Sequence, residues 1–452
     1  MAKVVLIGAG LTGISTAYHL EKNGFFEFKL FEKEATPGGL CRSVSHDGFT
    51  FDFTGHLLHA SDSYFYDLIT SIIGLENLNA IDRKSFIYSH ETFTKYPFQI
   101  NLFGLPPRVI VECITGFLNR THNPNPVSFR EWVLAQFGQG FGNQFFFDYQ
   151  EKIFAHPIDE ITASWTSRFV PQTSLEQILY GSLSDQKNEA VGYNARFLYP
   201  KKGGIQSWVH TLADQITQPI HTNFCVKAID MQKKVVTFTN GHTEPYDILI
   251  NTMPLDQLLS LSIESSSSSL KQAVPHLKCN QVVNFNIGVN RPDLSDKHWV
   301  YFPEKQYPFY RIGFWHNFSK SMAPEGCGSL YGEFAYRNQS PEWIEQTLDA
   351  SLKAAKKLFT ISDDDIITQK TFTIPHAYVT YDHWRDTYLS TLLDRLREHT
   401  IYSVGRYGAW KYSSMQEAVL DGRDTAHTIM QHITKKVPIE VLSHSKKEIS
   451  YE

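Results

Sequence analysis

Three glycines near the start of the chain have a spacing that can hold a diphosphate. Gly8, Gly10 and Gly13 form the pattern G-x-G-x-x-G. The first glycine of this pattern makes a tight turn, the second lets the backbone approach a pyrophosphate, and the third packs a helix on a strand. A helix that begins at the turn also offers unpaired N–H groups and its positive dipole end to the phosphates. The spacing therefore predicts a dinucleotide site.

An acidic residue stands where such a site needs one. Residues 3–7 are typical of a buried strand, residues 12–22 of a helix and residues 27–32 of a second strand. Glu32 ends the second strand, where an acid accepts hydrogen bonds from ribose hydroxyls. A tight turn alone would not explain this order of elements, so we favour a dinucleotide site over a purely structural turn.

Histidine and cysteine do not form a metal-binding pattern in this sequence. His56 and His59 are three residues apart, but no third ligand accompanies them. The cysteines are scattered, odd in number and never paired as C-x-x-C: Cys41, Cys113, Cys225, Cys279 and Cys327. We therefore expect no metal and no disulfide framework, and a reducing cytoplasm is the expected location.

Composition and charge narrow the class of protein. The chain has 452 residues, which predicts two or three domains, and its 42% of hydrophobic and 20% of charged residues are typical of a globular protein. The formal net charge of −5, without a basic run, argues against a nucleic-acid partner. No apolar run is long enough to span a bilayer, so we expect no membrane partner.

The rest of the chain predicts an α/β fold with two further regions. Residues 103–183 have a helical pattern, residues 282–334 alternate as strands do, and a strand and a long helix end the chain at 401–405 and 415–433. We expect a Rossmann-type domain in three parts (1–95, 195–260 and 396–440), a helical insert domain (100–190), a second, antiparallel β-sheet domain that binds substrate (270–395), and a tail (441–452).

Further glycine turns carry a resemblance to a known family. Pro37-Gly38-Gly39 follows Glu32, Gly203-Gly204 forms a similar pair, and Gly405-Arg406 precedes the last helix. Together with Asn251-Thr252-Met253-Pro254, these segments resemble the family of amine oxidases, protoporphyrinogen oxidase and UDP-galactopyranose mutase along nearly the whole chain. The resemblance implies FAD as the cofactor, bound by Gly8, Gly10, Gly13, Glu32, Gly38, Gly39, Leu40, Val226, Gly405, Arg406 and Gln416.

Within this family the chain is similar to UDP-galactopyranose mutase. Tyr96-Pro97-Phe98-Gln99 matches a segment at the uracil end of the nucleotide, and residues 299–304 and 308–311 match strands that carry a tyrosine and an arginine to the diphosphate. The resemblance implies catalytic roles for Arg168, Arg311 and His56, and substrate contacts for Tyr96, Phe98, Gln99, Asn194, Tyr301, Tyr378, Lys411 and Tyr412. Arginines suit a diphosphate because the guanidinium fork is planar and always charged.

Taken singly, these residues also have structural interpretations. Tyr301 and Tyr310 could pack in a core on alternate strand positions, and Arg168 and Arg311 could pair with an acid at the surface. His56 is expected to shape or hydrogen-bond the flavin, whereas His59 could be structural.

Three positions depart from the family pattern. Phe154 replaces a tryptophan of the helical domain, Gln150 replaces a nearby asparagine, and Lys411 replaces an arginine. These departures leave flavin and diphosphate recognition intact but leave the sugar, and the base, open.

The resemblance implies an FAD-dependent mutase that interconverts the pyranose and furanose forms of a UDP-sugar, through an adduct between the sugar and N5 of the reduced flavin. Reduced flavin would be the active form, with NAD(P)H a candidate reductant, and the resemblance leaves a homo-oligomer open. The alternative is an FAD-dependent oxidase or desaturase of the amine-oxidase or protoporphyrinogen-oxidase type, which predicts an aromatic cage without paired arginines. A non-catalytic flavin-binding protein is the third class.

Overall fold

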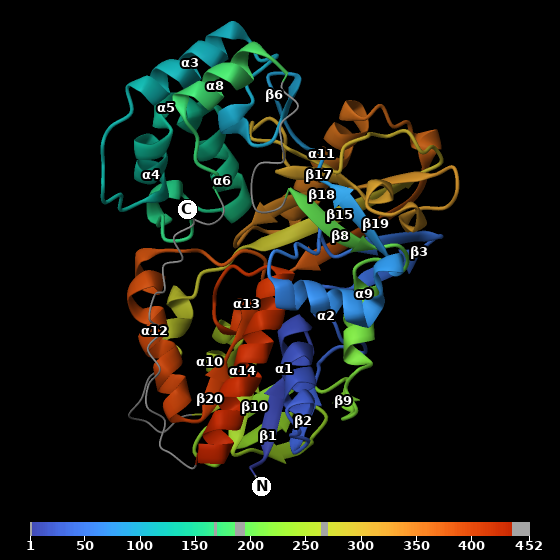
Figure 1. Ribbon diagram of the computed structural model, residues 1–452, viewed down its shortest axis with the longest axis vertical. Helices are drawn as coiled ribbons and strands as arrows, with labels where there is room; N and C mark the ends of the chain where they lie inside the picture. Colours follow the sequence, from blue (N-terminus) through green and yellow to red (C-terminus); the bar gives the residue numbers. More distant parts are fainter. Residues whose placement is uncertain (1, 167–169, 186–194, 264–269, 436–452) are drawn as a thin grey trace.

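A parallel five-stranded sheet occupies the lower part of the molecule as drawn in Figure 1. The computed structural model describes residues 2–166, 170–185, 195–263 and 270–435. The strand order is β20 (Ile401–Ser403), β13 (Ile248–Asn251), β1 (Val4–Ile7), β2 (Phe28–Phe31) and β9 (Ile220–His221). Three separate parts of the chain therefore build this sheet, as the sequence predicts.

Each face of the sheet packs against a different layer, because successive strand residues point to opposite sides. Val4 and Leu6 belong to a core shared with helices α1 (Leu11–Lys22) and α14 (Met415–Lys435). Val5 and Ile7 belong to a second core, under a four-stranded sheet. That sheet has the order β12 (Thr243–Pro245), β11 (Val235–Phe238), β10 (Val226–Asp230) and β14 (Ser262–Ile263). Burial on both faces explains why β1 is wholly apolar.

A seven-stranded sheet forms a second body above the first (Figure 1). Its order is β19 (Ile366–Ile374), β15 (Gln281–Val289), β18 (Gly328–Tyr336), β17 (Arg311–Phe314), β16 (Trp299–Tyr301), β6 (Ser85–Ser89) and β7 (Thr92–Lys95). All neighbouring strands are antiparallel except β16 and β6. Helix α11 (Pro341–Leu358) covers one face with an apolar stripe that includes Leu348 and Ala355.

Two segments lie outside the domain boundaries that the sequence predicts. Strands β6 and β7 belong to the seven-stranded sheet, although we expected residues 1–95 to form the dinucleotide domain. Helix α12 (His383–Glu398) packs through Leu389 and Leu396 into the core beneath the parallel sheet, although the expected β-sheet domain runs to residue 395. Periodicity shows where a strand or helix is, but not which distant element it pairs with.

The predicted helical insert forms the upper left of Figure 1. It comprises α3 (Pro107–Leu118), α4 (Phe129–Gln136), α5 (Gly138–Phe141), a π-helical stretch (Gly142–Phe146), α6 (Phe147–Phe154) and α8 (Leu175–Leu183). A phenylalanine-rich core holds these helices together. None of the helices in the described ranges is both long and apolar enough to cross a membrane.

Shorter elements connect these bodies. They are α2 (Ser63–Ile73), α9 (Gln206–Ala213), α10 (Leu255–Leu261), α13 (Gly405–Gly408), β3 (Ser43–His46), β4 (Phe49–Asp52), β5 (Leu78–Asp82) and β8 (Arg196–Pro200). The Asn240-Gly241 turn joins β11 to β12, and Gly241 has a positive φ of 86° that suits glycine.

Candidate functional site

The glycine turn between β1 and α1 leaves open space where the sequence predicts a pyrophosphate. A Cβ on Gly13 would overlap the carbonyl oxygen of Gly8, so Gly13 is required for packing the helix on the strand. A Cβ on Gly10 would meet only the Cα of Gly39, at 3.8 Å. The first turn of α1 contains no acidic residue, so nothing in its sequence opposes an anion. This geometry fits a diphosphate.

The carboxylate of Glu32 is buried beside the turn. One of its oxygens accepts from the Ala9 N–H at 2.7 Å and the other from the Glu34 N–H at 3.0 Å. Each carboxylate oxygen has a second lone pair, which leaves capacity for a ribose hydroxyl. The carbonyl of Glu32 accepts from the Phe224 N–H, which brings the start of β10, with Val226, beside it. The predicted turn, Glu32 and Val226 are thus brought together.

The segment after β20 closes on the same turn. Gly405 has a φ of 77°, and a Cβ there would lie 2.6 Å from the hydroxyl of Thr12 in α1. The guanidinium of Arg406 donates to the carbonyls of Ser413 at 2.8 Å and Ala377 at 2.9 Å. Arg406 therefore holds its own loop in place in addition to its predicted cofactor role.

Two predicted cofactor residues make contacts that organise the surrounding loops. The side-chain oxygen of Gln416 accepts from the N–H groups of Ser61 and Asp62, at 2.8 and 2.9 Å, and ties α14 to the loop that carries His56. Leu40 packs against the core of the helical insert. Direct contact of either residue with FAD stays a prediction.

Arg311 forms a buried ion pair. Its Nε and Nη2 donate to the carboxylate of Glu333, with the shortest distance 2.7 Å. Glu333 is fully buried, and the Arg311 side chain is 17% exposed. Arg311 is thus paired with an acid, as its structural interpretation required, but in the interior rather than at the surface. Its Nη1 donates to none of the described residues and is available for an anion.

Tyrosines surround this ion pair. Tyr301 lies between Tyr96 and Tyr149, with ring centroids 5.4 and 5.6 Å away. Tyr378 stacks parallel to Tyr412 at 6.4 Å. Burial raises the pKa of Tyr378 to about 12, so this phenol is a neutral hydrogen-bond donor at neutral pH. The structure thereby brings together four of the predicted substrate-binding tyrosines.

Further cations and an aromatic residue border the tyrosines. The guanidinium carbon of Arg406 lies 4.7 Å from the ring centroid of Tyr412, and that of Arg83 lies 4.9 Å from the ring centroid of Tyr96. Phe154, one of the three departures from the family, packs edge-on to Tyr378 at 6.3 Å. That departure therefore alters the wall of the candidate site.

His56 is neutral at neutral pH. Burial, followed by the positive charges of Arg406 and Arg311, lowers the pKa of His56 to about 4. A neutral imidazole can donate one hydrogen bond and accept another, which suits a ligand-shaping role. His59 lies edge-on to Phe197 at 5.9 Å, and burial likewise lowers the pKa of His59 to about 4.

Other predicted residues have different surroundings. Phe98 is fully buried in the helical insert, where it stacks on Phe145 at 5.1 Å, so in this structure it packs the core. The amide of Gln99 donates to the Pro171 carbonyl at 2.6 Å, and Lys411 pairs with Asp421 at 2.9 Å. Substrate contact by these three stays a prediction. Arg168 and Asn194 lie outside the described residues.

Glu333 and Arg83 are not among the residues that the sequence analysis assigns to the site. A signal for Glu333 was present, because an acid inside an otherwise apolar buried strand needs a partner. No comparable signal marks Arg83, which comes near Tyr96 only through the pairing of β6 with β7 and β16.

Comparison with known proteins identifies the family and the fold. Residues 11–430 match the family model described as flavin containing amine oxidoreductase. A crystal structure of reduced UDP-galactopyranose mutase superposes with a TM-score of 0.88 and 28% identity, covering 97% of this chain and 96% of that one. A protein from Exiguobacterium sp. 255-15, provisionally described as a protoporphyrinogen oxidase, has a TM-score of 0.75 and 16% identity over 95% and 98% of the two chains, which shows the fold alone.

Curated relatives match over short segments. A zeta-carotene-forming phytoene desaturase from Myxococcus xanthus is 42% identical over 50 residues, which is 11% of this chain and only 10% of the desaturase. This short match carries no whole-protein activity. The family model, by contrast, covers most of the chain, and its span includes the helix after the glycine turn and the tyrosine cluster. The chain belongs to the flavin-containing amine oxidoreductase family and has the fold of UDP-galactopyranose mutase.

Proposed function

We propose that this protein is an FAD-dependent mutase that interconverts the pyranose and furanose forms of a nucleotide sugar, with a UDP-sugar as substrate. The observation that carries the proposal is the buried Arg311–Glu333 pair among neutral tyrosines. It leaves one guanidinium nitrogen and several phenol groups for a diphosphate. The similarity to reduced UDP-galactopyranose mutase along the chain supports the same assignment.

The charge of the site opposes the alternative oxidase or desaturase activity. Arg406 and Arg311 carry two positive charges and Glu333 carries one negative charge, so these three groups have a positive surplus that repels an amine cation. A hydrocarbon substrate would also leave the buried charges of this cluster without polar partners from the ligand. A diphosphate satisfies both requirements, because it is anionic and accepts several hydrogen bonds.

The chain's own residues would bind and orient the substrate. FAD, when bound and reduced, supplies the nucleophile for the anomeric carbon. Arg311, together with Arg168, would hold the diphosphate as its charge grows on leaving the sugar, and the tyrosines would donate neutral hydrogen bonds. His56, neutral at the working pH, would hydrogen-bond or shape the flavin rather than supply charge.

The test is an anaerobic assay. Protein reduced with dithionite is mixed with UDP-galactopyranose, and the products are separated by chromatography. UDP-galactofuranose formed over many turnovers, without consumption of reductant, supports the proposal. In parallel, oxidised protein receives putrescine and oxygen. Peroxide formation without furanose would overturn the mutase in favour of an oxidase. A panel of other UDP-sugars then defines the sugar, and reduction by NADPH or NADH tests the reductant.

A further inference from the structure

The loop that carries Lys411 and Tyr412 is held in a costly conformation. Trp410, at its start, is fully buried and has a φ of 50°, a left-handed conformation that side chains other than glycine rarely adopt. Such a conformation persists only where surrounding contacts determine it, and it is frequent at functional sites. The contacts that hold Trp410 therefore indicate which residues fix the conformation of the loop.

The N–H groups of Trp410 and Lys411 donate to the nearby carbonyls of Tyr407 and Arg406, and the contacts from outside the loop come from the segment that begins α12. Arg385 donates through Nε to the carbonyl of Trp410 at 2.9 Å, and the hydroxyl of Tyr381 accepts from the Tyr412 N–H at 2.8 Å. The guanidinium carbon of Arg385 also lies 3.7 Å from the ring centroid of Tyr381, so the two side chains support each other. Both ends of the peptide Trp410–Tyr412 are thereby fixed.

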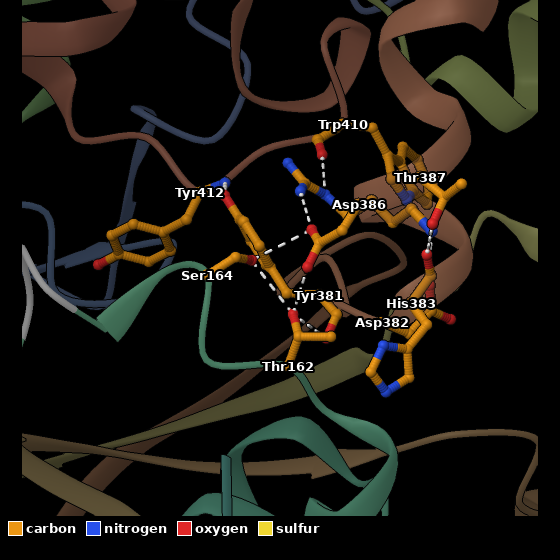
Figure 2. Close-up of polar contacts among 10 residues, drawn as sticks. Thr162, Ser164, Tyr381, Asp382, His383, Asp386, Thr387, Trp410 and Tyr412 are labelled. Atoms are coloured by element: carbon orange, nitrogen blue, oxygen red, sulfur yellow. Dashed lines mark hydrogen bonds and ion pairs between the residues drawn. The ribbon is translucent and has the colours of Figure 1, made fainter. Parts of the chain in front are cut away.

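The same segment holds the helical insert, as Figure 2 shows. Asp386 accepts from the hydroxyl of Thr162 at 2.6 Å and from that of Ser164 at 3.1 Å. Its carboxylate also pairs with Arg385 at 3.1 Å. The Thr162 N–H donates to the carbonyl of Tyr381 at 2.7 Å. Thr162 and Ser164 lie just ahead of Arg168 in the sequence.

Capping of α12 does not account for Asp386. The side chain of Asp382 already accepts from the Arg385 N–H at 2.9 Å and caps the helix. Asp386 instead uses both of its oxygens on groups outside the helix or on the arginine that reaches the loop. A helix terminus that only needed stability would not require these contacts.

We propose that Tyr381, Arg385 and Asp386 are positioning residues that set the Tyr412 loop and the Thr162–Ser164 segment relative to each other. This inference rests on the proposed function, in which Tyr412 contacts the diphosphate and Arg168 follows Thr162–Ser164. Hydrogen bonds of 2.6–3.1 Å connect the two segments: Asp386 bonds Thr162 and pairs with Arg385, Arg385 bonds the Trp410 carbonyl, and Tyr381 bonds the Tyr412 N–H.

Two variants test the set, and a third is their control. Tyr381→Phe removes only the acceptor for the Tyr412 N–H, and Asp386→Asn weakens the contacts to Thr162, Ser164 and Arg385. Thr387→Ala is the matched control, because among the described residues the hydroxyl of Thr387 bonds only the His383 carbonyl in its own helix. We expect both test variants to raise KM for UDP-galactopyranose by roughly three- to tenfold, the range of one or two ordinary hydrogen bonds.

Flavin content and Tm should match those of Thr387→Ala. A wild-type KM in both variants would overturn the proposal, as would losses of flavin and Tm that parallel the loss of activity.

Amide hydrogen exchange tests the same coupling without relying on activity. In Asp386→Asn, exchange should become faster in peptides covering both 162–166 and 409–414, and in Thr387→Ala in neither. Faster exchange in only one of the two peptides would overturn the coupling. If wild-type protein forms no furanose but both peptides respond, the proposed function fails while the positional coupling stands.

Discussion

At the scale of single residues, the pairing of Arg311 with Glu333 changes what an Arg311 variant reports. Each charge is buried, so removing one leaves the other without compensation in the interior. From the sequence, an Arg311 variant should lose activity and keep its stability. The structure corrects this expectation, because the side chain has a structural partner as well as a predicted ligand.

A pair of variants separates the two roles. Arg311→Met should lower the free energy of unfolding by about 3–5 kcal/mol, because the Glu333 charge is left buried and unpaired. Arg311→Met combined with Glu333→Gln removes both charges and should recover most of that loss in urea denaturation. Neither protein should form furanose if Arg311 binds the diphosphate. Recovery of turnover with recovery of stability would show that Arg311 has only a structural role.

Asp52 gives stability a dependence on pH. It is fully buried and accepts hydrogen bonds from Ser43, Tyr199 and the Ile205 N–H, but burial raises its pKa to about 6. Between about pH 4 and 6 the folded protein therefore binds more protons than the unfolded chain. Stability contributed at this position falls as pH rises through that window and is constant above it.

The corresponding prediction compares wild type with Asp52→Asn across pH 4–7. The variant should gain up to about 3 kcal/mol relative to wild type as the pH rises from 4 to 6, because the buried charge never forms. Denaturant titrations at each pH measure the difference. Tyr199→Phe removes a donor that favours the carboxylate, so in this variant the pKa of Asp52 should rise further and the fall in stability should continue above pH 6. A difference that does not change with pH would show that Asp52 is ionised throughout.

At the scale of elements, Gly10 and Gly13 in the turn between β1 and α1 have different roles. Gly13 is required by the protein, since its Cβ would overlap the Gly8 carbonyl, whereas a Cβ on Gly10 would make only an ordinary contact with the Cα of Gly39. We expect Gly10→Val to fold and to lack the yellow colour of bound FAD, because the side chain would fill the place of the pyrophosphate. Gly13→Val should fail to fold. Circular dichroism and the flavin absorbance distinguish these outcomes, and a fully yellow Gly10→Val protein would contradict the cofactor assignment.

At the scale of the whole molecule, α6 of the helical insert is fastened to the seven-stranded sheet by a lysine. Lys152 donates to the carbonyls of Phe302 at 2.6 Å and Glu304 at 3.0 Å, just beyond β16. Burial lowers the pKa of Lys152 to about 7. The folded protein therefore binds fewer protons than the unfolded chain above pH 7, and the stability contributed at this position rises as the lysine deprotonates.

We predict that wild type gains stability relative to Lys152→Met by about 1–2 kcal/mol between pH 7 and 9. Denaturant unfolding at a series of pH values provides the measurement. Lys305→Met is the control, because Lys305 is exposed and pairs with Asp148 of the same helix. The difference in the free energy of unfolding between wild type and Lys305→Met should stay constant between pH 7 and 9. If the stability difference from wild type changed equally with pH in both variants, the pH dependence would belong to the whole interface and not to Lys152.

Much of the fold follows from local spacing. The strand, glycine turn and helix of residues 4–22 form as predicted. Helix α8, within the predicted helical region, begins where Ser174 and Gln177 form a capping box. Turn and cap preferences act over a few residues, so they can be recognised in a sequence.

The sequence by itself therefore determined the dinucleotide turn, the helical insert and the residue types of the candidate site. Only the tertiary structure decided that Glu333 neutralises Arg311, that β6 joins β16, and that Asp386 links the helical insert to the Tyr412 loop. Asp386 is separated from its partner Thr162 by 224 residues, and no local preference encodes such a pairing. Contacts of this kind form because burying the apolar faces of sheets and helices brings distant polar groups together, where each buried group must find a partner.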